Sequence, residues 1–235
     1  MNERLDAAID ALERSADHPP AFAKPFVEMF PISGAAVSTV GSLFGSETVS
    51  ASNTLAARID ELQFDLGEGP CWDAMILARP ILEPNIQVSP RRIWPAFSTA
   101  LRDQNVASLF AFPLTLGGLR IGAIDLYSDR PVELDDSQSR QAEAMATIVG
   151  RNVLRRALDE LAGDYDDTVN AFSRRLVHQA TGMVLAQLRI PADDARLVIQ
   201  GHAFATNRSM MEVAQDVVDR TLTFTQGGAG IESSS

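Results

Sequence analysis

The sequence predicts an α+β fold in its first two thirds, followed by an all-α bundle of three helices. Between residues 35 and 127, short apolar or β-branched runs bounded by glycine or serine alternate irregularly with helical periodicity, which is typical of an α+β domain. Gly117 and Gly118 separate two of these runs and permit the positive φ angles of a tight hairpin, so a largely antiparallel sheet with flanking helices is expected. After residue 168 the apolar residues recur only at helical spacing.

The elements of the first part follow from periodicity and from the residues that interrupt it. Leu5, Ile9 and Leu12 share one helical face, and Pro19 and Pro20 end that helix. The same kinds of signal predict strands at 35–40, 48–52, 80–83, 109–116 and 121–127, and helices at 2–14, 21–30, 55–62, 71–77, 94–103 and 135–157.

The helical part begins after an acidic stretch. Residues 159–167 contain five acids, no base and Gly163, which marks a helical linker between two domains. Farther along, Pro191 opens a second helix, and Ser209 with Glu212 forms a capping-box pattern that starts a third. The expected division is a first domain at 1–158, the acidic linker at 159–167, a helical domain at 168–226 and a disordered Gly/Ser-rich tail at 227–235.

Apolar residues continue across this linker at a spacing that suits a coiled-coil seam. Such a seam predicts a homodimer, whereas the alternative is an ordinary amphipathic helix that docks on its own domain. The residues of the seam are Leu154, Leu158, Leu161, Tyr165, Phe172 and Leu176.

Composition and motifs exclude several classes of protein. The chain has 235 residues, a net charge of −11 and one cysteine, Cys71, so no internal disulfide or Cys-rich metal site is expected. Cys71 lies where a helix begins, which suits either a redox-sensing thiol or a small buried residue. The charged start of the chain lacks the apolar stretch of a signal peptide, and a cytoplasmic protein without a membrane segment is expected. There is no Walker, nucleophile-elbow or zinc-protease motif, no cofactor is expected, and we predict no enzyme activity.

Charge is distributed unevenly along the chain. Residues 168–226 hold six arginines and five acids, so this region is nearly neutral while the rest of the chain is strongly acidic. Arg174, Arg175 and His178 lie off the apolar stripe of their helix and are expected to face solvent. A nearly neutral module on an acidic body suits a local phosphate-binding face, although a solvated helix face explains the same residues.

Several runs in this sequence carry a family resemblance. Residues 168–224 contain Gln179-Ala180-Thr181-Gly182-Met183-Val184, Ala203-Phe204-Ala205 and Asn207-Arg208, and on these runs the region resembles the ANTAR domain, a three-helix RNA-binding module of bacterial antiterminators. Residues 20–157 contain Gly67-Glu68-Gly69-Pro70-Cys71, Trp94-Pro95 and Gly122-Ala123-Ile124-Asp125-Leu126-Tyr127, and they resemble GAF domains, which sense small molecules or signals. The order of the two resembles actinobacterial GAF-ANTAR antitermination regulators.

The ANTAR resemblance implies binding to paired hairpins in nascent messenger RNA by a homodimer. Hairpin loops expose unstacked bases that side chains can recognise. Two positions depart from the family pattern: Thr181 stands where many members have lysine, and Gln200 stands where arginine is common. His202 suits either base stacking or packing in the core. The expected RNA-binding residues are Arg174, Arg175, His178, Thr181, Arg196, His202, Asn207 and Arg208.

The GAF resemblance implies a sensory domain that binds an unidentified small molecule. The alternative is a GAF domain that serves only as a scaffold, with its pocket filled by its own side chains. The pocket is expected on the face of the sheet covered by residues 62–82. Its expected lining residues are Phe64, Trp72, Met75, Phe110, Phe112 and Tyr127.

Three other functions compete with RNA binding. A DNA-binding helix-turn-helix would need a polar recognition helix, but the third helix offers Glu212, Asp216 and Asp219, which repel phosphates. A methionine-sulfoxide reductase built on the GAF fold would need several cysteines, and this chain has one. A degenerate ANTAR module that binds no nucleic acid remains open because of Thr181 and Gln200.

Overall fold

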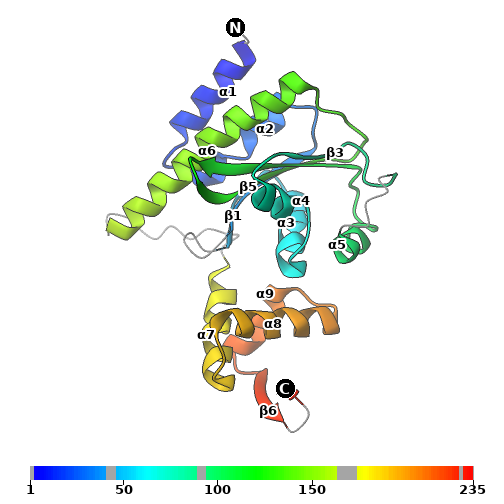
Figure 1. Ribbon diagram of the computed structural model, residues 1–235, viewed down its shortest axis with the longest axis vertical. Coiled ribbons are helices and arrows are strands. Elements are labelled where there is room, and N and C mark those ends of the chain that lie inside the picture. Colours follow the sequence, from blue (N-terminus) through cyan, green and yellow to red (C-terminus); the bar gives the residue numbers. More distant parts are fainter. Residues whose placement is uncertain (1–2, 41–45, 89–93, 163–173, 228–229, 235) are drawn as a thin grey trace. The chain divides into compact units, whose positions relative to one another are not determined.

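The structure is a computed structural model that describes residues 3–40, 46–88, 94–162, 174–227 and 230–234 (Figure 1). The chain divides into two compact units, at Met1–Phe172 and Ser173–Ser235. Each unit has a hydrophobic core of its own, so each is described by itself.

The first unit is built around a five-stranded antiparallel sheet with the strand order β2-β1-β5-β4-β3. The predicted hairpin between the last two strands is confirmed, and Gly117 takes a φ of 59° in its turn. The strands are β1 (Gly34–Thr39), β2 (Glu47–Ala51), β3 (Ile81–Glu83), β4 (Ser108–Leu116) and β5 (Leu119–Ser128).

Helices cover both faces of this sheet (Figure 1). The first face carries α1 (Glu3–Arg14), α2 (Lys24–Met29) and α6 (Asp136–Ala162), together with the short 3-10 helix η1 (Pro19–Ala21). The second face carries α3 (Thr54–Leu66), α4 (Pro70–Leu77) and α5 (Pro95–Ala100). The predicted α+β class, with an antiparallel sheet between flanking helices, is therefore confirmed.

Alternation along the strands separates the two cores. In β4, Phe110 and Phe112 enter the core beneath α1, α2 and α6, whereas Leu109 and Ala111 enter the core beneath α3 and α5. Successive side chains of a strand point to opposite faces, so the register of β4 decides which residues can line a site on either face.

The second unit is a bundle of α7 (Arg175–Leu188), α8 (Ala192–Thr206) and α9 (Met210–Val218). Its core contains Val184, Ile199 and Val213, one from each helix. The helix α9 begins with the predicted capping box of Ser209 and Glu212. The prediction of a three-helix bundle is confirmed.

The end of the chain differs from the expected disordered tail. Strand β6 (Thr223–Gly227) pairs with β7 (Gly230–Ser234) in an antiparallel hairpin. Phe224 is 3% exposed and belongs to the core of the second unit. Its backbone N–H donates to the side-chain oxygen of Gln187 (N–Oε1 3.0 Å), and Gln226 donates to the carbonyl of Leu188 (Nε2–O 3.2 Å). These contacts hold β6 against α7, and β7, in the Gly/Ser-rich tail, pairs with β6.

The predicted coiled-coil seam falls partly on described residues. Leu154 packs against the core of the first unit, whereas Leu158 is 57% exposed near the end of α6. Tyr165 and Phe172 lie outside the described residues, as does most of the predicted acidic linker. The dimer therefore remains a prediction.

Candidate nucleic-acid interface and ligand cavity

The helix α7 presents two of the expected RNA-binding residues. Arg175 and His178 are exposed and lie three positions apart, on one side of the helix. Arg174 was expected to face solvent but is 4% exposed, so that expectation is wrong. Residue 174 is the N-cap of α7 and precedes the first helical residue, so helical spacing does not determine the direction of its side chain.

Two further expected residues are half-buried. The hydroxyl of Thr181 donates to the carbonyl of Val177 one turn earlier (Oγ1–O 2.7 Å), which uses its single donor inside α7. Arg196 lies on α8 beside the buried Ala195 and is also half-buried. Both side chains reach the surface only in part.

Two glycines leave bare backbone on the surface of the helices. Gly182 in α7 and Gly201 in α8 are exposed, and a Cβ built at either position would meet no atom within 4 Å. A glycine inside a helix costs about 1 kcal/mol relative to alanine. Because no packing contact among the described residues requires these glycines, they are candidates for positions where a binding partner approaches the backbone. Neither glycine was among the expected site residues.

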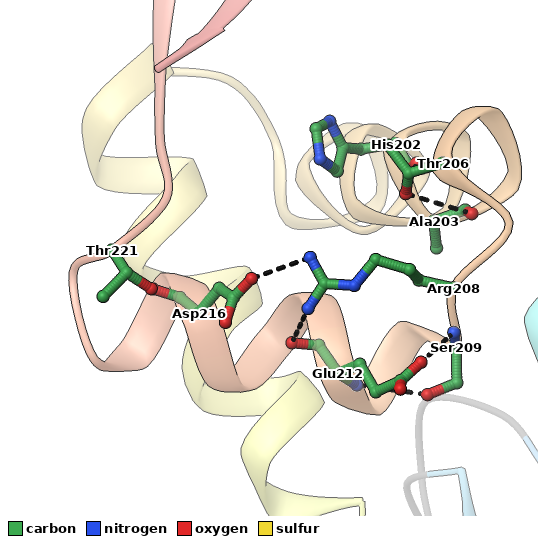
Figure 2. Close-up of polar contacts among 8 residues, drawn as sticks. All are labelled: His202, Ala203, Thr206, Arg208, Ser209, Glu212, Asp216 and Thr221. Carbon is green, nitrogen blue, oxygen red and sulfur yellow. Dashed lines mark hydrogen bonds and ion pairs between the residues drawn. The ribbon is translucent and has the colours of Figure 1, made fainter. Parts of the chain in front are cut away.

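The turn between α8 and α9 carries a closely connected polar cluster (Figure 2). Asn207 ends α8 in the left-handed conformation with a φ of 53° and is exposed. The guanidinium of Arg208 pairs with Asp216 (Nη1–Oδ2 2.7 Å) and donates to the backbone carbonyl of Glu212 (Nη2–O 3.1 Å). Ser209 and Glu212 form the capping box beside this pair. The capping box and the contacts of Arg208 together hold the turn between α8 and α9 in place.

This cluster limits what Arg208 can do. Its side-chain hydrogen bond to Asp216 raises the pKa of the guanidinium, which therefore stays protonated. A phosphate that binds Arg208 must compete with the carboxylate of Asp216 for the same donors. Arg208 is thus an exposed cation that is already engaged within the second unit.

The ring of His202 packs against the C-terminal hairpin. It meets Phe224 edge to face with ring centroids 5.5 Å apart, and the residue is half-buried. Of the two alternatives, base stacking or packing, this contact favours packing.

The residues expected to line a pocket in the first unit lie on two different faces of the sheet. Phe64 and Trp72 are neighbours, with ring centroids 6.2 Å apart, on the side of α3 and α4. Tyr127 faces that side as well, and its hydroxyl donates to Asn53 (Oη–Oδ1 3.1 Å). Burial raises the pKa of Tyr127. Met75 lies on the same side in a small cluster with Cys71 and the half-buried Trp72.

Phe110 and Phe112 were also expected in this pocket, and the structure contradicts that. Both lie in the core of the opposite face. Leu109 pairs with Tyr127 across the antiparallel ladder, and Phe110 pairs with Leu126. Directly paired residues share a face, so Phe110 and Tyr127 cannot line one pocket.

A cavity lies farther along the α3–α5 side, between β3, α5 and the start of β4. Its volume is about 440 Å³. The polar residues in its wall are Glu83, Gln87, Ser98, Arg102 and Gln104. The apolar residues are Ile86, Trp94, Phe97, Leu101, Val106 and Leu109. None of these residues was among the expected site residues. They all lie within residues 83–109, and the pairing of β3 with β4 brings the two ends of this stretch together.

A buried polar network ties the helices of this side to the sheet. Gln63 donates to Asp125 on β5 (Nε2–Oδ2 2.8 Å) and accepts from the backbone N–H of Cys71 on α4 (N–Oε1 2.8 Å). Nearby, the hydroxyl of Thr48 donates to the carboxylate of Asp60. Burial, followed by the charge of Asp60, raises the pKa of Asp125, although the hydrogen bond from Gln63 lowers it. Cys71 is buried, which favours its reading as a small core residue.

Comparison with protein families assigns both units. A GAF-domain model matches residues 26–154, which is more than half of the chain, and an ANTAR-domain model matches residues 171–218. The chain belongs to the GAF-domain family. Its GAF domain is followed by an ANTAR domain, as the resemblance predicted. No curated protein gives a significant match.

Solved structures support the GAF fold. The GAF domain of a phosphoenolpyruvate-protein phosphotransferase from Acinetobacter is 9% identical, with a TM-score of 0.53 over 70% of this chain and 96% of that one. A domain described as part of a two-component sensor histidine kinase from Sinorhizobium meliloti is 17% identical, with a TM-score of 0.50 over 63% and 96%. A GAF domain from a Coxiella burnetii phosphotransferase is 10% identical, with a TM-score of 0.50 over 69% and 98%. At these identities the similarity establishes the fold.

The assignment defines the general kind of protein. GAF domains are sensory and ANTAR domains are RNA-binding modules of antiterminators, so both are regulatory families. The ANTAR match ends at the last residue of α9, so the hairpin of β6 and β7 lies beyond it. Within the described ranges, no helix has the length and apolar character needed to cross a membrane. Among the same residues, no three His, Cys, Asp or Glu side chains gather in a way that would hold a metal ion.

Proposed function

We propose that this protein is a transcription antiterminator that binds paired hairpins in nascent messenger RNA through its ANTAR domain, under the control of its GAF domain. The observation that carries the proposal is the ANTAR match over three helices that enclose a core of their own. Capture of two hairpins prevents formation of the competing terminator helix.

The surface of the ANTAR domain supports this proposal. Arg175 supplies an exposed cation for a phosphate, and His178 and Asn207 expose groups that can hydrogen-bond to base edges. Gly182 lies on α7 one turn from His178 and leaves the backbone uncovered. Exposed groups whose chemistry suits loop bases, and an exposed cation whose charge suits phosphates, thus lie on α7 and at the end of α8.

Double-stranded DNA is a poorer fit to the same domain. A helix-turn-helix protein would insert its recognition helix into the major groove. Glu212 on α9 is exposed, as is Asp219, the residue that caps the C-terminal end of α9, and the half-buried Asp216 lies between them. Carboxylates along this helix repel the phosphates that line a groove.

The alternative of a domain that binds a protein instead of RNA is supported by the environment of Thr181. The hydroxyl of Thr181, at a position where family members often carry lysine, is occupied within α7. A module that lacks this cation would bind RNA weakly and could serve as a protein interaction domain instead. Measurement of RNA affinity distinguishes the two functions.

The proposal includes a homodimer, because two hairpins require two ANTAR domains. The exposed side chain of Leu158 near the end of α6 is one apolar group that a second copy would cover. A signal in the GAF domain would then act by binding one arrangement of the dimer more tightly than another.

The test measures binding of the full chain to a synthetic RNA with two hairpins. The controls are the same stems with scrambled loops and a duplex DNA of equal length, each titrated across salt concentrations. We expect binding that depends on the loop sequence. Replacement of one arginine that contacts a phosphate lowers the slope of log affinity against log salt by roughly 0.7 to 0.9. Arg175→Ala should show this change, whereas Arg140→Ala, an equal loss of charge on α6, should not.

Two results would count against the proposal. Equal and steeply salt-dependent binding to all three nucleic acids would indicate simple attraction to phosphates. Absence of binding at protein concentrations up to about 100 μM, for both the wild type and a Thr181→Lys variant, would favour the interaction-domain alternative.

A further inference from the structure

We infer that Phe204, near the end of α8, stacks against an unpaired base of the RNA hairpin loop. This inference rests on the RNA binding proposed for the ANTAR domain, and it names a residue that would recognise the loop. Phe204 was not among the expected RNA-binding residues.

Phe204 is the most exposed aromatic residue that the structure describes. Its exposed fraction is 69%, whereas the other aromatic residues in the described ranges are buried or half-buried. An apolar ring in water gains free energy when a flat apolar surface covers it. The unstacked bases of a hairpin loop offer such surfaces, and aromatic side chains are common platforms for them.

The backbone beside the ring is uncovered, which leaves room for a base. Gly201 lies three positions before Phe204 in α8, and residues at this spacing are neighbours on the surface of a helix. A Cβ built at Gly201 would meet no atom within 4 Å, so the ring of Phe204 leaves the space above this glycine open. A base can therefore enter this space beside the ring without a clash at position 201.

The charges near Phe204 suit a base better than a phosphate. Arg208 lies four positions later, in the turn after α8, and its guanidinium is paired with the carboxylate of Asp216 (Nη1–Oδ2 2.7 Å). A cation that is balanced in this way attracts a phosphate only weakly. Stacking of a base on an aromatic ring needs no cation and tolerates any base, because every base has a π-face.

A protein interface is a poorer fit to this part of the surface. Leu197 on α8 and Ile231 on β7 are also exposed apolar residues, and they line a small pocket together with Gly201. Even three side chains of aromatic size, at about 150–250 Å² each, fall short of the roughly 800 Å² per partner that a stable interface buries. Asn207, which is exposed in the turn after Phe204, is polar.

The experiment measures the affinity of the full chain for the two-hairpin RNA, in the wild type and in three variants of one position. Phe204→Ala should weaken binding by roughly 5- to 150-fold, the loss expected for one stacked base. Phe204→Trp keeps an aromatic ring and should bind as tightly as the wild type. Phe204→Leu keeps apolar bulk without a flat ring and should be nearly as weak as the alanine variant. Ile76→Ala removes a similarly exposed apolar side chain from α4 of the GAF domain and should have no effect.

Two further measurements separate stacking from other contacts. The slope of log affinity against log salt should be the same for Phe204→Ala as for the wild type, because the lost contact carries no charge. In the second measurement, 2-aminopurine, whose fluorescence reports on stacking, replaces each loop base in turn. At protein concentrations that saturate the RNA, the fluorescence change at one loop position should be present in the wild type and absent in Phe204→Ala. Circular dichroism and thermal unfolding establish that each variant is folded.

Four results would overturn the inference and leave the proposed function in place. The first two are unchanged RNA affinity of Phe204→Ala and wild-type affinity of Phe204→Leu. The third is a 2-aminopurine signal that does not depend on Phe204 at any loop position. The fourth is a lower mass of Phe204→Ala in sedimentation velocity without RNA, which would assign the residue to an interface between two copies of the chain. Absence of RNA binding by the wild type would overturn the proposed function and this inference together.

Discussion

Replacement of Gly182 by alanine should stabilise the ANTAR domain and weaken its binding to RNA at the same time. The residue lies inside α7, where glycine is about 0.8–1.0 kcal/mol less favourable than alanine. The added methyl group would meet no atom within 4 Å, so no packing cost reduces this gain. Stability alone therefore predicts that alanine is the better residue at position 182.

The size of the stabilisation can be measured by thermal unfolding. The second unit spans Ser173–Ser235, and in a domain of this size 1 kcal/mol raises Tm by roughly 4–8 °C. If the RNA backbone or a base approaches the bare helix, the methyl group occupies space at the interface. A steric cost of about 1.4 kcal/mol would weaken RNA affinity tenfold.

The assay follows Tm and RNA affinity for the same three proteins. Gly182→Ala and Gly201→Ala occupy open positions on α7 and α8, and Gly118→Ala is the control, since it also has open space but lies in the hairpin of the first unit. A rise in Tm without any loss of RNA affinity would refute the idea that Gly182 lies at the interface. Absence of a rise in Tm would contradict the claim that glycine at position 182 destabilises α7 relative to alanine.

Three further predictions concern charge, burial and the C-terminal hairpin. Asp216→Asn should free Arg208 from its ion pair, so the affinity for RNA should increase and its dependence on salt should steepen by roughly one ion; an unchanged slope would show that Arg208 makes no phosphate contact. Burial raises the pKa of Asp125, so the folded chain keeps the proton on this carboxyl group to a higher pH than the unfolded chain does. The stability that comes from this difference is complete below about pH 4, the pKa of the unfolded chain, and is lost as the pH rises through the pKa of the folded chain. Asp125→Asn should remove that part of the pH dependence in urea unfolding of the first unit, and parallel curves for the two proteins would contradict the assignment. Phe224→Ala should destabilise the second unit by about 3–5 kcal/mol, whereas Thr225→Ala, at an exposed position of the same strand, should have little effect.

The order and kind of the elements could be predicted because local signals determine them. The glycine pair at 117–118, the capping box at Ser209 and Pro191 before α8 act within a few residues of chain. Each of these elements appears in the structure. The short stretches that resemble GAF and ANTAR domains also identified the two domains correctly.

The composition of the two faces could not be predicted in the same way. A shift of one residue in the register of β4 would exchange Phe110 with Leu109 on the α3–α5 side, and register depends on pairing between distant strands. The cavity around Glu83 depends on the same long-range order. At the helix start, the burial of Arg174 was not predicted because the periodic pattern ends there. In the tail, the strand β7 forms by pairing with β6, whose Phe224 is buried just before the Gly/Ser-rich residues.

The amide of Gln63 has a direction that the rest of the GAF domain must respect. Its nitrogen faces an acceptor on β5 and its oxygen faces a donor on α4, so rotation of the amide by half a turn would oppose like groups at both ends. Gly69 passes so close that a Cβ there would lie 2.5 Å from the same oxygen, so any larger residue at position 69 would displace the amide of Gln63. Gln63 thus joins α4 to β5 in a single orientation of its amide. A displacement of α4 or of β5 would break one of these two hydrogen bonds.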